Sequence, residues 1–279
     1  MTVNGNLKRD RACPLAGLRS RRSFQRAGVR DIVAPVRQYC RGALAIGMSG
    51  DADEFAPTTA DYGLLALPLD RAAAAYADLF AAASVPLDRR EVGGDAGDVF
   101  AELEPVSMAV DRALLVAHGP GWTSYFANGL LGSDPFLPVS RIAAARGRTG
   151  LRIVRRPDAT ILEVYEGPDR GGDATHHRRT IFAARDGRWR FGSTGTPFPF
   201  EDTRRYAARR VRDRFTPDHL DALLTGLGAP PSPLPDAPRL TGTLFVQRGK
   251  APQLPRWSYA EVRAGVPWRR DPGGPGARD

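Results

Sequence analysis

The side chains best suited to chemistry lie between His118 and Asp134. His118 has an imidazole that can transfer protons, and Asp134 is a second catalytic candidate. Trp122 and Tyr125 could form an aromatic wall for a planar ligand, while Asn128 could make polar contacts to it. The same residues also fit a structural interpretation, with the aromatic rings in a sheet core, Asn128 in a turn and Asp134 capping a helix. We favour the structural interpretation, so catalytic roles for His118 and Asp134 stay an alternative.

A second group of candidate side chains consists of Asp173, His176 and His177. Adjacent residues of a strand point to opposite faces, so one metal ion cannot readily bind both histidines. No other ligand stands at a recognised spacing nearby. The sequence therefore predicts no metal site, and nothing in it indicates a cofactor.

The third candidate is an arginine-rich segment that follows Glu201. Its pattern predicts a helix on which Arg205, Arg209 and Arg212 share one face at spacings of four and seven residues. Guanidinium groups in such a row can bind phosphates or the carboxylates of a partner. The alternative is a solvated helix face with weak ion pairs to Glu201 and Asp202.

Recognised catalytic motifs are missing from the sequence. It has no phosphate-binding glycine loop ending in Lys-Ser or Lys-Thr, no His-Glu-x-x-His, no Cys-x-x-Cys and no Gly-x-Ser-x-Gly. We therefore lean against an enzyme, although chemistry built from residues distant in sequence stays open.

The predicted elements indicate the α+β class. Asp186-Gly187 between two strand-like runs predicts a tight hairpin, and Thr216-Pro217 marks the start of a helix. The consecutive hairpin pairs favour an antiparallel sheet of about five to seven strands, with helices packed mainly on one face. The expected strands are 62–69, 112–118, 122–127, 151–155, 160–165, 180–185, 188–193 and 240–247, and the expected helices begin at Asp70, Val139, Glu201 and Thr216.

Positive charge is concentrated at the start of the chain. Residues 1–47 hold ten of the arginines and lysines and two aspartates, so most of the formal net charge of +9 lies there and the remainder is almost neutral. We expect residues 1–60 to be a disordered basic leader and linker, with Met48 as an alternative start. Ser20 to Arg26 resembles a twin-arginine export pattern, but charged residues interrupt the apolar segment that should follow. A cytoplasmic location is therefore expected, with export as the minor alternative.

The remaining chain divides by composition. We expect a core domain at 61–228 with a surface loop at 88–97, a proline-rich connector at 229–238, a C-terminal appendage at 239–270 and a disordered tail at 271–279. Both cysteines, Cys13 and Cys40, lie in the leader. No apolar run approaches the roughly 18 residues that a membrane span needs, so no membrane partner is expected.

These observations favour a non-enzymatic bacterial protein that binds another macromolecule, of the accessory or immunity type. The bacterial origin is inferred from a composition rich in alanine, arginine, glycine and proline and poor in lysine. One alternative is a small-molecule enzyme or binder with a pocket around His118. Another is nucleic-acid binding through the leader and the arginine-rich segment, which the near-neutral core makes a poor expectation for the core itself.

Overall fold

The computed structural model describes residues 54–167, 177–249 and 254–268. All of these residues belong to one compact unit. The predictions for Met48, for the twin-arginine-like pattern, for both cysteines and for the tail at 271–279 lie outside the described residues, as do those for Asp173 and His176.

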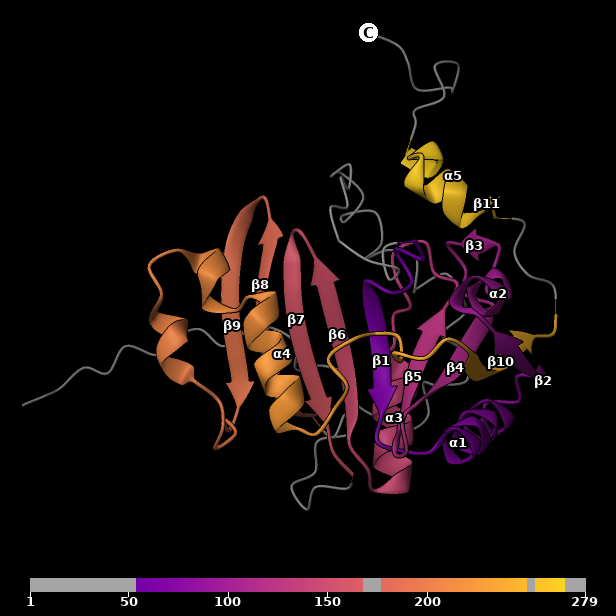
Figure 1. Cartoon of the computed structure of the whole chain (residues 1–279), viewed down its shortest axis with the longest axis horizontal. Helices are drawn as coiled ribbons and strands as arrows, with labels where there is room; N and C mark the ends of the chain where they lie inside the picture. Colours follow the sequence, from indigo (N-terminus) through magenta and orange to yellow (C-terminus); the bar gives the residue numbers. More distant parts are fainter. Residues whose placement is uncertain (1–53, 168–176, 250–253, 269–279) are drawn as a thin grey trace, which may run out of the picture. The chain divides into compact units, whose positions relative to one another are not determined.

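The described residues form a mixed helix and strand structure around a large antiparallel sheet (Figure 1). Nine strands follow the order β2-β10-β4-β5-β1-β6-β7-β8-β9, and β3 pairs separately with β11. The strands are β1 (Asp61–Leu65), β2 (Leu87–Gly94), β3 (Val106–Ser107), β4 (Arg112–His118), β5 (Trp122–Ala127), β6 (Gly150–Arg156), β7 (Ala159–Tyr165), β8 (His177–Asp186), β9 (Arg188–Gly195), β10 (Leu240–Gln247) and β11 (Arg256–Trp257). The helices are α1 (Leu69–Ala82), α2 (Ala96–Ala101), α3 (Phe136–Arg146), α4 (Pro217–Gly226) and α5 (Tyr259–Arg263), with 3-10 helices η4 (Thr203–Ala207), η5 (Val211–Arg214) and η6 (Val266–Trp268). None of these helices combines the length and the apolar character needed to cross a membrane.

The α+β class and the antiparallel sheet are confirmed, but the strand number and the placement of the helices differ from expectation. Leu115 and Tyr125 face one side of the sheet and pack in the same core cluster as residues of α1 and α3. Leu114 and Phe126 face the other side, in a cluster with residues of α2 and α4. Two-residue alternation in the central strands thus gives two apolar faces, and each face is covered by helices.

The C-terminal region is part of the same core rather than an appendage. Strand β10 lies between β2 and β4 and pairs with both of them. The proline-rich segment before it cannot form a ladder, but it packs: Leu234 is buried, and the Pro233 carbonyl accepts a hydrogen bond from Ser124. Composition separates these residues from the core, whereas long-range pairing joins them to it.

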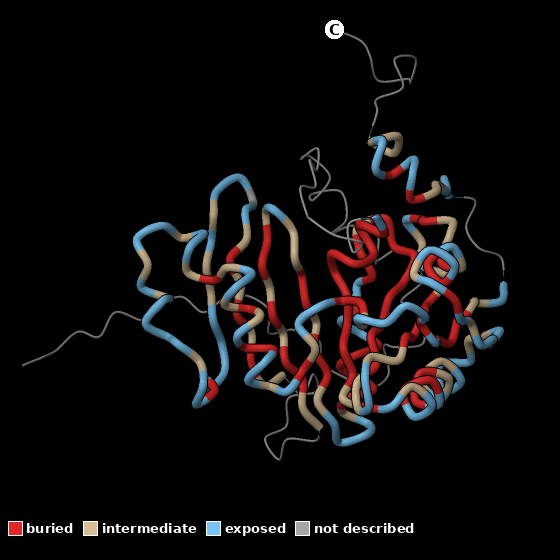
Figure 2. The backbone as a smooth tube through the Cα atoms, viewed as in Figure 1, coloured by how far each residue is buried: buried red, intermediate tan, exposed pale blue. Residues whose placement is uncertain are grey.

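Two further boundaries differ from the sequence-based expectation. Residues 55–60, expected to belong to the linker, are buried (Figure 2). Phe55 stacks on Phe100. Residues 88–94, within the expected surface loop, belong to the edge strand β2. An edge strand exposed to solvent carries charges on its surface, so its sequence lacks the apolar alternation that identifies a half-buried strand.

Helix α3 approaches the sheet closely at two glycines. A Cβ atom added to Gly63 in β1 would stand 2.5 Å from Val139 Cγ2 and 2.9 Å from Pro135 Cβ, and one added to Gly150 in β6 would stand 2.7 Å from Val139 Cγ1. Such distances are shorter than van der Waals contact. The two glycines therefore form a flat place in the sheet on which the helix rests.

Gly63→Ala is expected to lower the free energy of unfolding by about 1–3 kcal/mol, because α3 must move away from the sheet to admit the methyl group. Urea denaturation measures the change. Gly121→Ala is the matched control, since a Cβ there meets no atom within 4 Å. Equal stability of Gly63→Ala and the unmodified protein would contradict this account of the packing.

Candidate functional site

His118 makes a structural contact rather than facing a reactive serine. It lies at the end of β4 opposite Trp122, and its Nδ1 is 2.8 Å from Ser124 Oγ. The hydroxyl of Ser124 donates to the Pro233 carbonyl at 3.0 Å, so its hydrogen is already used. Nδ1–H must then donate to the serine oxygen, which is the opposite polarity from the one that activates a nucleophile. Ser124 is also fully buried, and burial lowers the pKa of His118 to about 4.

The aromatic side chains near His118 fill the sheet interior. Tyr125 is only 3% exposed and packs beside Tyr76 of α1. Trp122, on the other face, is partly buried against the main core cluster. The structure therefore places these two rings on opposite faces of β5, and they do not line one wall.

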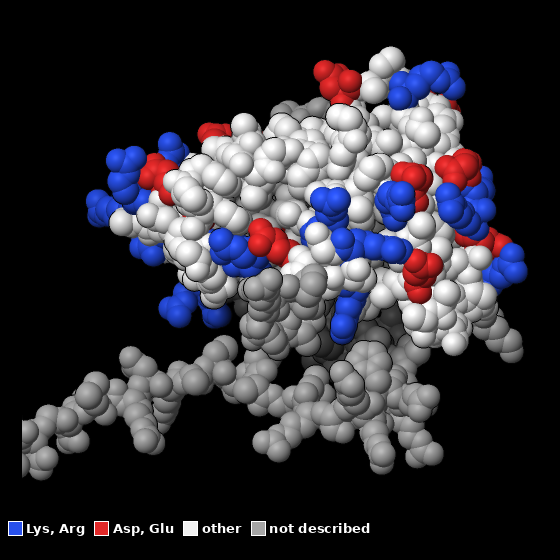
Figure 3. Space-filling model, turned by 90° about the horizontal axis from the view of Figure 1, so that it is seen from below, with Lys and Arg blue, Asp and Glu red and all other residues white. Residues whose placement is uncertain are grey.

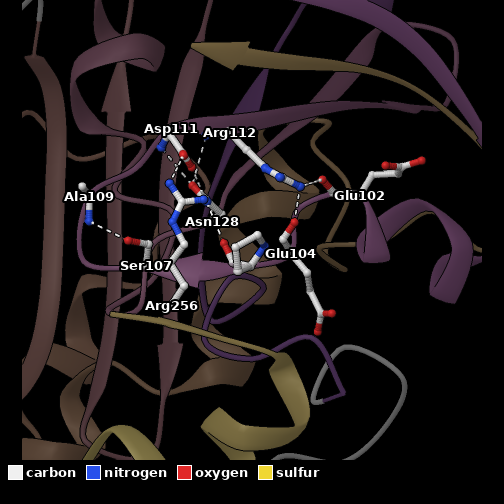
Figure 4. A network of polar contacts seen from close by, with 9 residues as sticks. Glu102, Glu104, Ser107, Ala109, Asp111, Arg112, Asn128 and Arg256 are labelled. Carbon is white, nitrogen blue, oxygen red and sulfur yellow. Dashed lines mark hydrogen bonds and ion pairs between the residues drawn. The ribbon is translucent and has the colours of Figure 1, made fainter. Parts of the chain in front are cut away.

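Asn128 is fully buried and uses all of its hydrogen-bonding groups (Figure 4). Its Oδ1 accepts from the backbone amides of Asp111 and Arg112, both at 3.1 Å. Its Nδ2 donates to the Pro105 carbonyl at 2.8 Å and to the Asp111 carboxylate at 2.7 Å. Arg256 binds the other oxygen of that carboxylate, which connects β11 to the same network. Asn128 thus fixes the loop before β4 and has no group left for a ligand.

Asp134 belongs to a different neighbourhood from His118. It precedes α3 with a positive φ of 42°, and the charged groups that it influences are Asp61 and Arg152. Arg152 donates to both carboxylate oxygens of Asp61, at 3.2 and 2.9 Å, and also reaches Glu163. Burial raises the pKa of Asp61, which Arg152 opposes and Asp134 reinforces. Sequence reasoning missed this network, although Arg152 and Glu163 occupy paired positions in β6 and β7.

A metal site is not formed by the described residues. Among them, no three or more His, Cys, Asp or Glu side chains converge. His177 instead contacts the Thr180 hydroxyl through Nε2, and its ring lies 5.6 Å from that of Tyr165.

The expected helix from Glu201 is wrong in type. The chain forms two short 3-10 helices, η4 and η5, separated by residues 208–210. Arg205, Arg209 and Arg212 therefore do not form a helical row: Arg205 contacts Asp202 and His219, Arg212 pairs with Asp213, and Arg209 lies between the two 3-10 helices. Alanine and arginine favour an α-helix locally, but tertiary contacts made by this segment prevail over that preference.

Those contacts centre on a buried ion pair between Arg179 of β8 and Glu201. The two side chains are 2% and 1% exposed. Arg179 donates to both carboxylate oxygens and, through Nη1, to the carbonyls of Thr194 and Gly195, each at 2.9 Å. Glu201 also accepts from the Tyr206 hydroxyl at 2.7 Å and from the Phe198 amide at 3.1 Å. Burial alone would raise the pKa of Glu201, but these hydrogen bonds together lower it.

Aromatic packing completes the attachment of residues 196–215, which we call the strap. Tyr206 packs on Phe191 of β9 with 5.0 Å between ring centroids, and the Arg214 guanidinium lies over the same ring. Phe215 is 1% exposed and anchors the end of the strap beside α4. The strap is thus held on β8 and β9 without a long helix of its own.

Arginines gather on the hairpin formed by β8 and β9 and on the strap, at the left end of Figure 3. Residues 177–215 contain eleven arginines and four acidic residues. Eight of the arginines are exposed, and we call them the arginine surface: Arg185, Arg188, Arg190, Arg204, Arg205, Arg209, Arg210 and Arg212. Asp202 pairs with Arg204 and Arg205, and Asp213 pairs with Arg212. Among the side chains that the structure describes, no carboxylate pairs with the other five.

The pKa of His118 generates a prediction for stability. The folded-state pKa of about 4 lies below the unfolded value of about 6.5, so unfolding takes up a proton between these pH values. The contribution of the neutral imidazole is complete above about pH 6.5 and is lost as pH falls toward 4. The free energy of unfolding falls as the solution is acidified, and His118→Gln should make that fall smaller by about 1–2 kcal/mol. The effect is smaller than the full pKa shift implies, because the ring is only half-buried and solvent screens its charge. Urea denaturation at several pH values measures it, and an NMR titration giving His118 a pKa near 6.5 would contradict it.

The buried pair generates a second prediction. Glu201→Gln should lower the free energy of unfolding by about 3–5 kcal/mol at pH 7, because it leaves the Arg179 charge buried without its partner. Since the folded-state pKa of Glu201 is lowered, its contribution is complete above the unfolded value of about 4.3 and is lost as pH falls through the folded value. The difference in unfolding free energy between Glu201→Gln and the unmodified protein, measured by urea denaturation, should thus become smaller as the pH is lowered.

Glu166→Gln is the matched control for this measurement. Its carboxylate lies 3.6 Å from Arg178 and is 45% exposed, so its removal should change stability by less than about 1 kcal/mol. Similar losses from Glu166→Gln and Glu201→Gln would show that the buried pair has no special weight.

Comparisons with known proteins add no family to this description. No family model, no curated protein and no solved structure matches the chain. The functional argument therefore rests on the arginine surface and on the contacts that hold it.

Proposed function

We propose that this chain is a non-enzymatic protein-binding domain, of the accessory or immunity type, that holds an acidic partner against its arginine surface. The observation that carries the proposal is a group of five exposed arginines that have no carboxylate partner among the side chains that the structure describes: Arg185, Arg188, Arg190, Arg209 and Arg210. Arginine presents a planar fork that matches a carboxylate with two hydrogen bonds. A partner carrying carboxylates at the right positions supplies what these side chains lack.

The attachment of the strap supports the same proposal. Arginine side chains bind more tightly when the backbone that carries them is already fixed, since less conformational entropy is lost. The Arg179–Glu201 pair fixes the strap to the sheet just before η4, and the Phe191–Tyr206 contact fixes it within η4. The charges of the arginine surface are therefore presented on an ordered framework.

A protein partner fits the surface better than a nucleic acid. Phosphate binding is favoured by a positive surface without intervening acids. Here Asp202, Asp213 and Asp218 lie among the arginines, and each is exposed. The arginines also flank a free strand edge, whose backbone groups match a polypeptide rather than a phosphate chain.

The enzyme alternative draws less support from the geometry. His118 is occupied by Ser124, and Asp134 is coupled to Asp61 and Arg152 instead of to that histidine. Asn128, the proposed polar contact for a ligand, is fully satisfied within the protein. The residues that suggested a pocket thus act in three separate structural roles.

The test reverses charge on the arginine surface. Affinity purification of the full chain from the cells that make it should recover an acidic protein in stoichiometric amount, quantified by mass spectrometry. Arg209→Glu with Arg210→Glu should lower that recovery by at least about tenfold, because two attractive contacts become repulsive. Thermal stability should not change, since neither side chain has a carboxylate partner in the described structure.

Arg141→Glu with Arg148→Glu is the matched control. Both residues are exposed and lie on or just after α3, away from the strap. Equal recovery of the partner with the two double variants would refute the proposal. Recovery of nucleic acid in place of protein, with affinity that falls steeply with salt, would replace it by the nucleic-acid alternative.

A further inference from the structure

Strand β9 has a free edge. It is the last strand of the sheet and pairs only with β8. Beyond that ladder, no backbone-to-backbone hydrogen bond among the described residues involves residues 188–195. Only the carbonyls of Thr194 and Gly195 are engaged further within the described structure, by the Arg179 side chain. An unpaired edge of this kind offers backbone donors and acceptors to an additional strand.

The groups that point outward can be identified from the register. The Arg185 amide donates to the Asp158 carbonyl at 2.8 Å, so the backbone groups of Arg185 face β7. The amide and carbonyl groups of successive residues point to opposite sides of a strand. The backbone groups of Ala184 and Phe182 therefore face β9, where these residues pair with Arg190 and Gly192. In β9 it is therefore residues 189, 191 and 193 whose amides and carbonyls face away from the sheet.

The opposite edge of the sheet is protected in a way that β9 is not. On β2, Arg89 pairs with Glu91, Arg90 with Glu102, and Asp88 with Arg248 of the chain after β10. That edge carries both signs of charge, neutralised within the protein, which is a common protection against strand pairing. On β9 the charged side chains are Arg188 and Arg190. Both are positive, and neither pairs with a carboxylate among the side chains that the structure describes.

From this contrast we infer that β9 accepts an extended segment of a partner protein as an additional strand, with acidic residues at every second position of that segment. The inference rests on the proposed function and specifies how the partner binds. Arg188 and Arg190 project from one face of β9, while the half-buried Trp189 and Phe191 project from the other. A neighbouring strand would place carboxylates beside the arginines and apolar side chains beside the aromatic rings. The occupant is thus a segment in which acidic and apolar residues alternate.

A second copy of the chain is a poor occupant of the same edge. Pairing of β9 with another β9 would bring two arginine surfaces together. Like charges on adjacent strands are destabilising, and here each surface contributes several of them. The edge therefore selects an acidic segment and discourages self-association.

Hydrogen exchange on the full chain tests the inference directly. The probe is a blocked peptide of alternating glutamate and valine, and the control has the same residues in separate blocks of glutamate and valine. With the alternating peptide at about 1 mM, the amides of Trp189, Phe191 and Ser193 should exchange at least about tenfold more slowly. The amides of Arg190, Gly192 and Thr194 already bond to β8 and should change less. No binding at that concentration, equal binding of both peptides, or unchanged exchange at the three outward amides would overturn the inference.

Variants of Ser193 separate this inference from the proposed function. Ser193→Pro removes an outward amide without removing a bond to β8, so it should abolish binding of the alternating peptide and of the natural partner, while Ser193→Ala should bind both. If Ser193→Pro still recovers the partner that Arg209→Glu with Arg210→Glu loses, the strand addition is wrong and the protein-binding function stands. If none of these changes affects recovery, both fall.

Discussion

The Arg179–Glu201 ion pair is the interaction on which the arrangement of the strap depends. Burying two charges costs several kcal/mol for each ion, and only complete hydrogen bonding offsets that cost. Here the guanidinium reaches both carboxylate oxygens and two carbonyls, and the carboxylate accepts from Tyr206 and Phe198 as well. Such a pair adds little net stability over apolar packing, but any other placement of the strap would leave an isolated buried charge. Its main effect is therefore to select one position for the strap.

The two edge strands of the sheet, β2 and β9, differ in how their charges are balanced. At β2, carboxylates and arginines neutralise one another across neighbouring elements. Near β9, three of the four acidic residues of the segment 177–215 are committed elsewhere: Glu201 to the buried pair, Asp202 to Arg204 and Arg205, and Asp213 to Arg212. The residual positive charge therefore results from where the acids are used, which a count of charges along the chain cannot show.

How much of this could be predicted from the sequence depends on the distance over which each signal acts. The Asp186-Gly187 hairpin, the strands on either side of Gly119 and the helix after Thr216 follow from local patterns, and all are present. The position of β10, the strand character of β2 and the 3-10 form of the strap depend on pairing across long stretches of chain. One long-range contact was indicated by the local sequence. Arg179 points to the same face of β8 as Ile181 and Ala183, and both of those residues are fully buried. A charged residue at a buried strand position requires a partner, so the pattern indicated the ion pair without identifying Glu201. For the candidate site, the residue types did not reveal the roles of His118, Asn128 and Asp134, because those roles are decided by neighbours that are distant in sequence.

The composition of β9 explains why a binding edge can stand at this end of the sheet. The central strands are largely buried, whereas β9 is mostly exposed (Figure 2). Large apolar side chains fill both faces of the central strands, while β9 carries glycine at 192 and 195 and small polar residues at 193 and 194. Burial of its own side chains therefore contributes little to holding β9 in place. It is held instead by the ladder to β8, by the Arg179 bonds to Thr194 and Gly195, and by Phe191 beneath the strap. Because β9 is held mainly through its backbone, its exposed side chains are not needed for packing. Those positions can therefore hold arginines, which a more deeply buried strand would exclude.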